Sequence, residues 1–299
     1  MREIINSISV GGLTAVYRRE SETGVVELVL IPAGCESEIV RTDCAAEPLV
    51  QAKLETDDAP AFFSGGRTMR NGPTVSAIVF DGQIVQKSDD KTVILTTLTD
   101  ARGLAYTHTL TLYADNPAAE VVTSVENTGS APVTFEMLSS FTLGSISPFA
   151  TGLAPETLKI HRLRSTWSAE GRLVTDRAED LQLEPSWKCY SANCLRFGVI
   201  GGYPVHGFAP FCAVEDTVHG VTWAAATTQG SSWQMELYRS DMGLSLSGGL
   251  ADREFGAWCK TLAPGACFTA PKAVLTAVRG GVDAAAQVLA ENTRRSVEP

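Results

Sequence analysis

Short segments rich in β-branched residues, separated by turn residues, recur along most of this chain. The clearest are "GVVELVLIPA", "SAIVFDGQIVQ", "TVILTTLTD" and "TLTLYADNPAAEVVTSVEN", each bounded by Gly, Pro, Asn or Asp. This pattern is typical of β-strands. Further strands are predicted at 195–200, 221–228, 232–237, 243–246 and 273–277. The sequence therefore predicts an all-β protein.

Two segments predict specific connections. In "EVVTSVENTGSAPVTFEMLSSFTL" we expect a hairpin, with one strand ending near Val125 and its partner running over 133–143. Asn127 and Gly129 would supply the positive-φ positions of its turn. We expect "TLAPGACFTAP" to be a loop that turns at Pro264 and Gly265.

Helix signals are scarce until the end of the chain. The run "GGVDAAAQVLAENTRR" has an Ala-rich interior, with Asp283 near its start and Arg294 and Arg295 near its end. Acid at the N-terminus and base at the C-terminus of a helix stabilise it through the helix dipole. The chain of 299 residues is thus expected to form one large all-β domain closed by one helix.

Charge and hydropathy exclude several partners. The net charge is −10 and no cluster of Lys and Arg occurs, so we expect no nucleic-acid partner. No run of 18 apolar residues is present, so we expect no membrane span. The N-terminal stretch lacks the apolar core of a signal peptide, which favours a cytoplasmic location.

The seven cysteines form an odd set without metal-site spacing. The odd number of cysteines favours reduced thiols. Because no C-x-x-C pair occurs, we also predict no metal site, and we expect no cofactor. They are Cys35, Cys44, Cys189, Cys194, Cys212, Cys259 and Cys267.

An acidic pair near two tryptophans invites comparison with a glycosidase. Glu215 and Asp216 follow an apolar run, and Trp223 and Trp233 come next. Adjacent residues on a strand point to opposite faces, so the two carboxylates are not expected to flank one bond. We predict a turn role instead, in which they accept backbone N–H groups.

The histidines and tryptophans are compatible with two further functions that involve sugars: mutarotase catalysis and sugar stacking. His206, in the polar loop "GGYPVHGFAP", could donate to a ring oxygen as an acid or base of a mutarotase, or it could be an ordinary loop residue. The tryptophans could form a platform for sugar stacking, or they could fill a core between sheets. The other residues of these two sets are His108, His161, His219, Trp167, Trp187 and Trp258.

Several motifs together carry a family resemblance. They are "FFSGGRTMRN" at 62–71, "AVED", "GSSWQMEL", "SGGLADREFG" and an L-x-P-G-x-x-F-x-x-P run at 262–271. In this order they resemble the N-terminal domain of glycoside hydrolase family 36, which contains α-galactosidases. The resemblance implies a large antiparallel β-supersandwich, galactose mutarotase-like, over 1–280. Residues 281–299 would then be a linker helix leading toward a (β/α)₈ catalytic barrel that this chain lacks.

The catalytic motifs of that family are missing from the sequence. Family members carry one aspartate in Lys-Trp-Asp and another in Ser-Asp-x-x-Asp. No tryptophan here lies between Lys and Asp, and Ser240-Asp241 is followed by Leu244 where the second aspartate is required. The resemblance thus implies no catalytic residue in this chain. It implies a non-catalytic domain of an enzyme that hydrolyses terminal α-galactosides.

The resemblance also implies a role for the segment "DDAPAFFSGGRTMRN" at 57–71. In bacterial family members this loop closes the active site of a neighbouring subunit in a homo-oligomer. Asp58 and Arg70 are the candidate substrate-binding residues, and we expect the loop's polar groups to face water. From the residues alone, an ordinary loop with a surface ion pair is the alternative. For the whole chain the alternatives are an independent carbohydrate-binding module and a mutarotase-like aldose epimerase.

Overall fold

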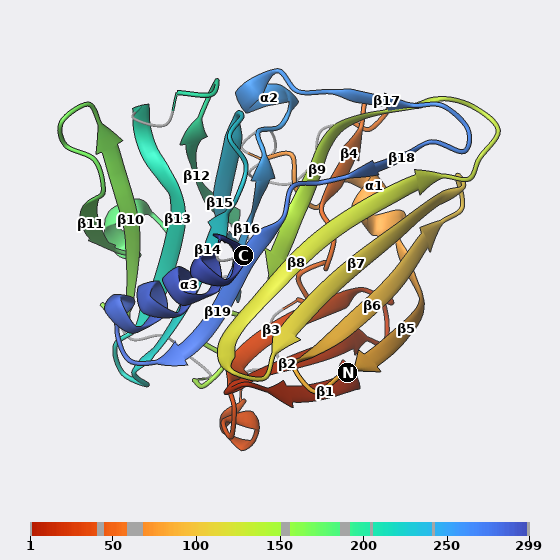
Figure 1. The fold of residues 1–299 in the computed structure, drawn as a ribbon. Coiled ribbons are helices and arrows are strands. Elements are labelled where there is room, and N and C mark those ends of the chain that lie inside the picture. The colour runs from red at the N-terminus through yellow and green to blue at the C-terminus, as the bar shows by residue number, and fades with distance from the viewer. Residues whose placement is uncertain are drawn as a thin grey trace.

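The computed structural model describes residues 2–40, 45–58, 68–150, 156–185, 192–203, 206–240 and 243–297. Within these ranges the chain forms three antiparallel sheets and a C-terminal helix (Figure 1). The predicted all-β antiparallel sandwich is therefore confirmed. None of the helices in this part of the chain is long and apolar enough to cross a membrane.

The largest sheet contains ten strands among the described residues, in the order β11-β10-β13-β14-β19-β8-β7-β6-β5, with β18 paired to β8. Their bounds are β5 (Val79–Lys87), β6 (Lys91–Asp100), β7 (Leu104–Tyr113), β8 (Asn116–Asn127), β10 (Leu158–Thr166), β11 (Arg172–Arg177), β13 (His206–Asp216), β14 (Val221–Thr227), β18 (Cys267–Thr269) and β19 (Ala273–Arg279). Side chains on β6 and β7 alternate between buried and half-buried, as the period of two in their sequences predicts.

The two smaller sheets pack against this one. The second sheet has the order β12-β15-β16-β9-β17, with β4 paired to β9, and the third has the order β1-β2-β3. Their strands are β1 (Arg2–Val10), β2 (Leu13–Glu20), β3 (Val26–Pro32), β4 (Ala52–Leu54), β9 (Val133–Leu143), β12 (Ala192–Val199), β15 (Trp233–Ser240), β16 (Gly243–Leu250) and β17 (Lys260–Leu262). One continuous apolar core fills the space between the sheets, and Trp223 lies within it.

The predicted C-terminal helix is present as α3 (Val282–Val297), with Asp283 in its first turn and Arg294 and Arg295 in its last. It lies across one face of the large sheet (Figure 1). Its apolar side, which includes Leu289, packs against alanines such as Ala213 on that face. The proposed boundary between a 1–280 domain and a 281–299 linker stays a prediction, but the helix itself is packed on the sheet.

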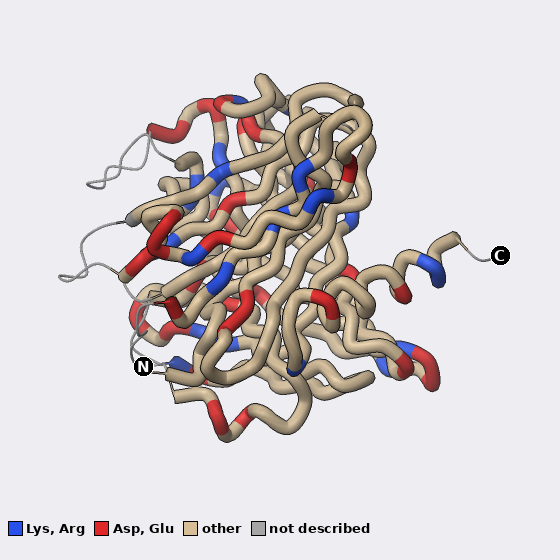
Figure 2. Tube along the Cα trace, turned by 90° about the vertical axis from the view of Figure 1, so that its left-hand side faces the viewer, with Lys and Arg blue, Asp and Glu red and all other residues tan. Residues whose placement is uncertain are grey.

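Four short helical turns complete the structure: α1 (Pro73–Ala77), α2 (Arg253–Gly256) and 3₁₀ turns at Glu36–Glu38 and Glu179–Leu181. Basic and acidic residues are interspersed along the strands (Figure 2).

The predicted hairpin at 120–143 is wrong. Both strands exist, but β8 belongs to the ten-stranded sheet and β9 to the sheet that contains β16. Neither Asn127 nor Gly129 has a positive φ. Asn127 instead donates from Nδ2 to the carbonyl oxygens of Ala131 and Leu262, at 2.9 and 3.0 Å. The connection therefore crosses from one layer of the sandwich to the other.

The predicted loop at 261–271 is only partly a loop. It contains the end of β17 and all of β18, which pair with β9 and β8 respectively. The turn between them includes Gly265 at a φ of 76°, as its Pro-Gly sequence predicts. Each three-residue strand is too short to show a period in the sequence.

Candidate functional site

The sheet that contains β15 and β16 has an unusually polar buried face. Gln234, Glu236 and Tyr238 alternate with apolar residues along β15, so they share one side of the strand. Ser247 and Ser245 on β16 lie opposite Glu236 and Tyr238. All five are buried, which places a set of polar groups inside the protein.

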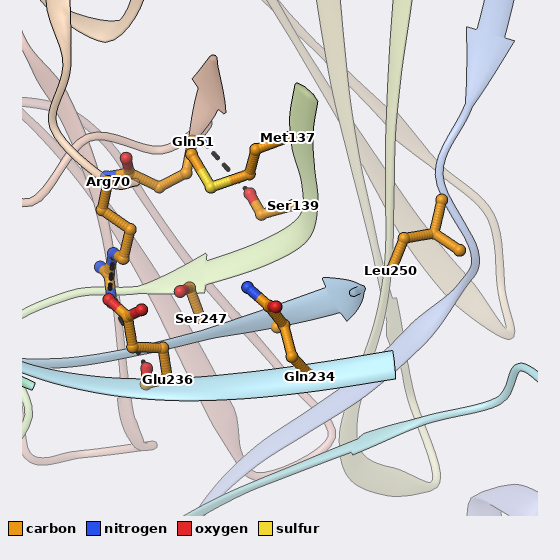
Figure 3. Close-up of a pocket in the computed structure, with 9 residues that line it drawn as sticks. Gln51, Arg70, Met137, Ser139, Gln234, Glu236, Ser247 and Leu250 are labelled. Atoms are coloured by element: carbon orange, nitrogen blue, oxygen red, sulfur yellow. Dashed lines mark hydrogen bonds and ion pairs between the residues drawn. The ribbon is translucent and has the colours of Figure 1, made fainter. Parts of the chain in front are cut away.

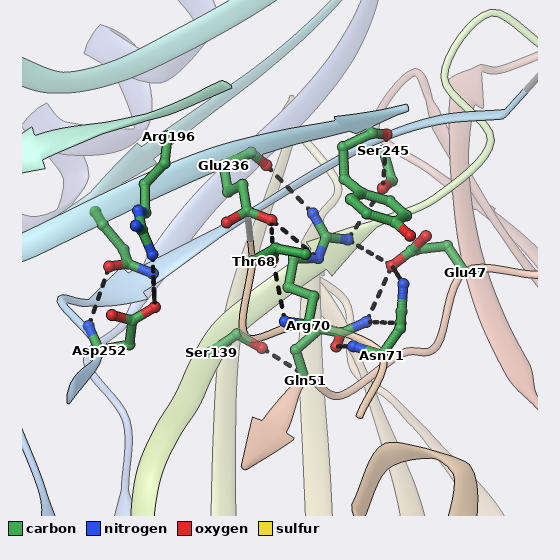
Figure 4. Close-up of polar contacts among 12 residues, drawn as sticks. Glu47, Gln51, Thr68, Arg70, Asn71, Ser139, Arg196, Glu236, Ser245 and Asp252 are labelled. Atoms are coloured by element: carbon green, nitrogen blue, oxygen red, sulfur yellow. Dashed lines mark hydrogen bonds and ion pairs between the residues drawn. The ribbon is translucent and has the colours of Figure 1, made fainter. Parts of the chain in front are cut away.

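Arg70 is the central cation of this face (Figure 4). Its Nη2 atom donates to Glu47 Oε1 at 2.5 Å and to Ser245 Oγ at 3.0 Å. Its Nη1 atom donates to the Glu236 carbonyl oxygen at 3.3 Å, and its Nε atom lies 3.9 Å from Glu236 Oε1. The guanidinium also lies 5.0 Å from the ring centre of Tyr238. Its side chain is only 2% exposed.

Two carboxylates share this one cation. Burial raises the pKa of Glu236, while Arg70 and the Thr68 hydroxyl oppose the rise. Thr68 Oγ1 donates to Glu236 Oε1 at 2.6 Å. Arg70 is therefore the cation that both carboxylates contact, and its removal would leave them buried without that counter-charge.

Gln51 connects this cluster to the covering segments. Its Nε2 atom donates to Glu47 Oε1 at 2.9 Å and to Asn71 Oδ1 at 2.6 Å. Its Oε1 atom accepts from the Asn71 backbone N–H at 2.9 Å. These bonds join the segments around residues 47–51 and 68–71 to each other, and Arg70 joins both to β15 and β16.

Beside Arg70, the polar face surrounds a small cavity (Figure 3). Met137, Gln234 and Leu250 are among its lining residues, and its volume is about 10 Å³. That space is enough for about one water molecule. In this arrangement it does not admit a sugar ring.

The structure separates the two candidate substrate-binding residues. Asp58 is exposed, as expected, whereas the expectation that Arg70 faces water is wrong. Arg70 is buried because Glu47 and Glu236 supply its counter-charges. Residues 59–67 of the same loop lie outside the described residues. A sugar-binding role of Asp58 and Arg70 stays a prediction.

The acidic pair at the end of β13 does not form a shared site. Asp216 accepts from the backbone N–H groups of Val218 and His219, both at 2.9 Å, which confirms its predicted turn role. Glu215 points to the opposite face, where its Oε2 atom lies 2.9 Å from His161 Nε2. The turn role is therefore wrong for Glu215.

The four histidines have separate environments. Nδ1 of His161 bonds to the Thr175 hydroxyl at 2.9 Å, and Nδ1 of His219 lies 2.8 Å from Asp216 Oδ2. His108 is fully buried, and burial lowers its pKa to about 4. His206 is exposed. Within the described ranges, no three His, Cys, Asp or Glu residues are grouped so that they could hold a metal ion.

The tryptophans divide between core and surface. Trp223 and Trp233 are buried in the core, as one of the two alternatives predicted. Trp258 is half-buried with its ring centre 5.6 Å from that of Phe268, and Trp167 is 75% exposed. Trp187 lies outside the described residues. The buried polar residues Glu47, Gln51 and Glu236 were not predicted, although the polar alternation of Gln234 and Glu236 within an apolar strand is a usable signal.

No family model matches this sequence, and no curated protein matches it. Several solved structures do share its fold. An α-galactosidase AgaA variant from Geobacillus stearothermophilus in complex with stachyose has a TM-score of 0.69 at 14% identity, over 95% of this chain and 42% of that chain. The α-galactosidase from Lactobacillus brevis gives a TM-score of 0.67 at 14% identity, over 96% and 41%.

The galactosidase domain of an α-galactosidase-sucrose kinase, AgaSK, is similar to the same degree. Its TM-score is 0.69 at 12% identity, over 94% of this chain and 41% of that chain. This chain thus spans about two fifths of the length of these proteins. Identities this low establish a shared fold and no more. The chain has the β-sandwich fold of one part of the glycoside hydrolase family 36 α-galactosidases.

Proposed function

We propose that this chain is a non-catalytic domain of an α-galactosidase-like glycoside hydrolase. The observation that supports the proposal is the extent of the fold match, which covers 95% of this chain but 42% of an α-galactosidase. On this proposal the complete enzyme hydrolyses terminal α-galactosides with retention. The chemistry belongs to a barrel that carries the two aspartates.

The carboxylates of this chain support a non-catalytic role. A retaining glycosidase needs two carboxylates about 5 Å apart on either side of the scissile bond. Here Glu47 and Glu236 are bound to the guanidinium of Arg70, next to a cavity of about 10 Å³. Glu215 is bound to His161. The cavity beside Glu236 is too small for a sugar ring, and Glu215 is paired with a histidine rather than with a second carboxylate.

We further propose that the domain supports a homo-oligomer and closes the substrate site of a neighbouring subunit. Asp58 is the proposed sugar contact, because it is exposed. Arg70 is bound to Glu47 and Glu236. For Arg70 to bind sugar directly, it would have to leave these two carboxylates.

A cytoplasmic location belongs to the same proposal. It rests on the odd number of cysteines in the sequence. Cys212 is fully buried, and burial raises the pKa of its thiol to about 12, so it stays protonated. Thiol titration of protein unfolded without reductant should count seven groups.

The test compares this chain with the enzyme that contains it. The 299-residue protein should release no nitrophenol from nitrophenyl α-galactoside in a saturable manner. In the barrel-containing enzyme, Asp58→Asn should lower kcat/KM by roughly ten- to a hundredfold, the effect of losing one charged hydrogen bond. The melting temperature should not change.

Asp89→Asn, an exposed aspartate between β5 and β6, is the matched control and should leave both quantities unchanged. Saturable hydrolysis by the 299-residue protein would refute the non-catalytic role. An Asp58→Asn variant with normal kinetics would refute the closing role.

A further inference from the structure

A second pocket, distinct from the Arg70 cluster, opens at one end of the sandwich. It lies where β12 ends and β13 begins, close to the turn between β14 and β15, and its volume is about 100 Å³. Its principal wall residues are Tyr203, Phe208, Pro210, Gln229, Ser231 and Trp233. It shares no lining residue with the small cavity beside Arg70.

The chemistry of the wall selects for a neutral ligand. Among the described residues, no Lys, Arg, Asp, Glu or His lines the pocket, so a charged ligand would lose hydration without gaining a counter-charge there. Three of the wall residues, Tyr203, Phe208 and Trp233, are aromatic. Aromatic faces bind the apolar C–H faces of ring compounds, including sugars.

The aromatic wall is held in position before any ligand arrives. The ring of Phe208 lies 5.2 Å from that of Phe197, and the guanidinium of Arg162 lies 5.4 Å from its centre. Trp233 packs edge-on against the same Phe197 at 6.1 Å. Because these side chains are already ordered, binding costs little conformational entropy. Tyr203, which is 57% exposed, stands at the mouth.

The side chain of Gln229, another wall residue, has an amide oxygen that receives no hydrogen bond from the described residues. Its Nε2 atom donates to the carbonyl oxygens of Ser232 at 2.8 Å and Gly249 at 3.3 Å. The amide oxygen, Oε1, is buried. Because that atom is closed off from solvent, it does not contact a ligand in this arrangement, and Gln229 contributes to the wall as a side chain fixed by its two Nε2 bonds. The hydroxyls of Tyr203 and Ser231 are the polar partners that a ligand can reach at this pocket.

We propose that this pocket is a subsite for one neutral pyranose ring of a saccharide. An engineered 150 Å³ cavity in another protein holds benzene, so a pocket of about 100 Å³ encloses only part of a six-membered ring and leaves the rest exposed at the open mouth. The remaining sugar units extend past Tyr203 into solvent. This inference does not depend on the proposed accessory role, because it uses only the residues of this pocket.

The first test is a titration of the 299-residue protein, followed by saturation-transfer NMR. Methyl α-D-galactopyranoside and methyl α-D-glucopyranoside are the neutral probes, and galacturonate is the charged one. At least one neutral probe should bind with a Kd on the order of millimolar, as expected for a ligand of this size. Galacturonate should bind at least about tenfold more weakly. Failure of both neutral probes to bind, or tighter binding of galacturonate, would overturn the proposal.

The second test uses variants. Tyr203→Ala should weaken binding of the neutral probe by about tenfold, and Ser231→Trp should abolish it by blocking the mouth. Both residues are exposed, so neither change should prevent folding. Trp167→Ala removes an exposed aromatic at the turn between β10 and β11 and should leave binding unchanged. Binding that survives both pocket variants would refute this site, and would leave the role of Asp58 untouched.

Discussion

At the scale of single residues, buried charge is the most costly feature of this fold. Arg70 is among its largest fully buried side chains. Its charge is tolerated because Glu47 and Glu236 accompany it, and Ser245 takes a further N–H group. Removing one partner from such a cluster leaves an uncompensated charge in a region of low polarity. The cluster therefore makes the covering segments dependent on one side chain.

Arg70→Met should destabilise the protein by about 3–5 kcal/mol, because it leaves two buried carboxylates without their cation. Denaturant unfolding at neutral pH measures this change. Arg177→Met is the control, since that side chain is 47% exposed and its surface ion pairs should contribute little to stability. If Arg70→Met left stability unchanged, the guanidinium would not hold the cluster together, and direct sugar binding would become the better explanation.

His108 should make stability fall in acid. Its pKa is lowered to about 4 in the folded protein, against 6.5 for an ordinary histidine. Below pH 6.5 His108 is protonated in the unfolded chain but stays neutral in the folded protein. The free energy of unfolding therefore falls as the pH drops. The free energy of unfolding decreases by about 1.4 kcal/mol per pH unit between pH 6.5 and the pKa of folded His108. At pH 5 the decrease is about 2 kcal/mol.

His108→Phe, which keeps a ring of similar size, removes this titration. The wild-type protein should therefore lose about 2 kcal/mol more than the variant between pH 7 and pH 5. Urea unfolding at both pH values provides the comparison, and the other titrating groups cancel in the difference. Equal losses in the two proteins would mean that the His108 ring is protonated, or reached by water, in the folded state.

At the scale of elements, local sequence predicts strands better than it predicts their partners. The alternation in β8 and β9 identifies both strands, but their neighbours are chosen by residues far away in the chain. Asn127 bonds to the carbonyl oxygen of Leu262, 135 residues later, and Gly129 packs tightly against the Arg102 carbonyl. A short connection with turn residues is equally compatible with a hairpin and with a crossing between layers.

The C-terminal helix α3 is the opposite case, because its sequence pattern was sufficient to predict it. The position of α3 in the sequence follows from its charges and its apolar side. The surface of the sheet that it packs against contains small residues such as Ala213 and Ala224. Alanines on β13, β14 and β8 allow the helix to approach the sheet closely. This complementarity is visible only once the strands are placed next to one another.

Leu289→Ala should reduce the free energy of unfolding by about 2–3 kcal/mol, since this side chain is 6% exposed between α3 and the sheet. Gln287→Ala, on the exposed side of the same helix, should change it by less than about 0.5 kcal/mol. Chemical denaturation of the two variants distinguishes a docked helix from a free one. Equal, small effects would show that the helix is not held on the sheet in solution.

At the scale of the whole molecule, the sandwich could be predicted from the sequence but the polar cluster could not. Strand periodicity is a local property, and it survives at 14% identity to structures with a TM-score of 0.69. The Arg70 cluster depends on contacts such as that between Arg70 and Glu236, which are 166 residues apart. No spacing rule relates these positions. The sequence did single out Arg70, but as a solvent-facing group.

Buried hydrogen bonds join the N-terminal sheet to the rest of the molecule. Trp223 on β14 donates from Nε1 to the Leu30 carbonyl oxygen on β3, at 2.7 Å. Arg18 on β2 donates to Glu27 at 2.7 Å and to Ser145 at 2.8 Å, beyond the end of β9. One apolar core also includes side chains from all three sheets. The N-terminal sheet therefore has no separate core of its own among the described residues.

The three sheets should accordingly unfold in a single transition. Tryptophan fluorescence, which reports on buried residues such as Trp223, and far-UV circular dichroism, which reports on all the strands, should give coincident curves. Trp223→Phe loses the bond to Leu30 and leaves a cavity, so it should lower the midpoint by an amount equivalent to about 1–3 kcal/mol without separating the curves. A variant in which circular dichroism changes before fluorescence would show that the N-terminal sheet can unfold alone. The buried connections through Trp223 and Arg18 would then be too weak to couple the layers of this sandwich.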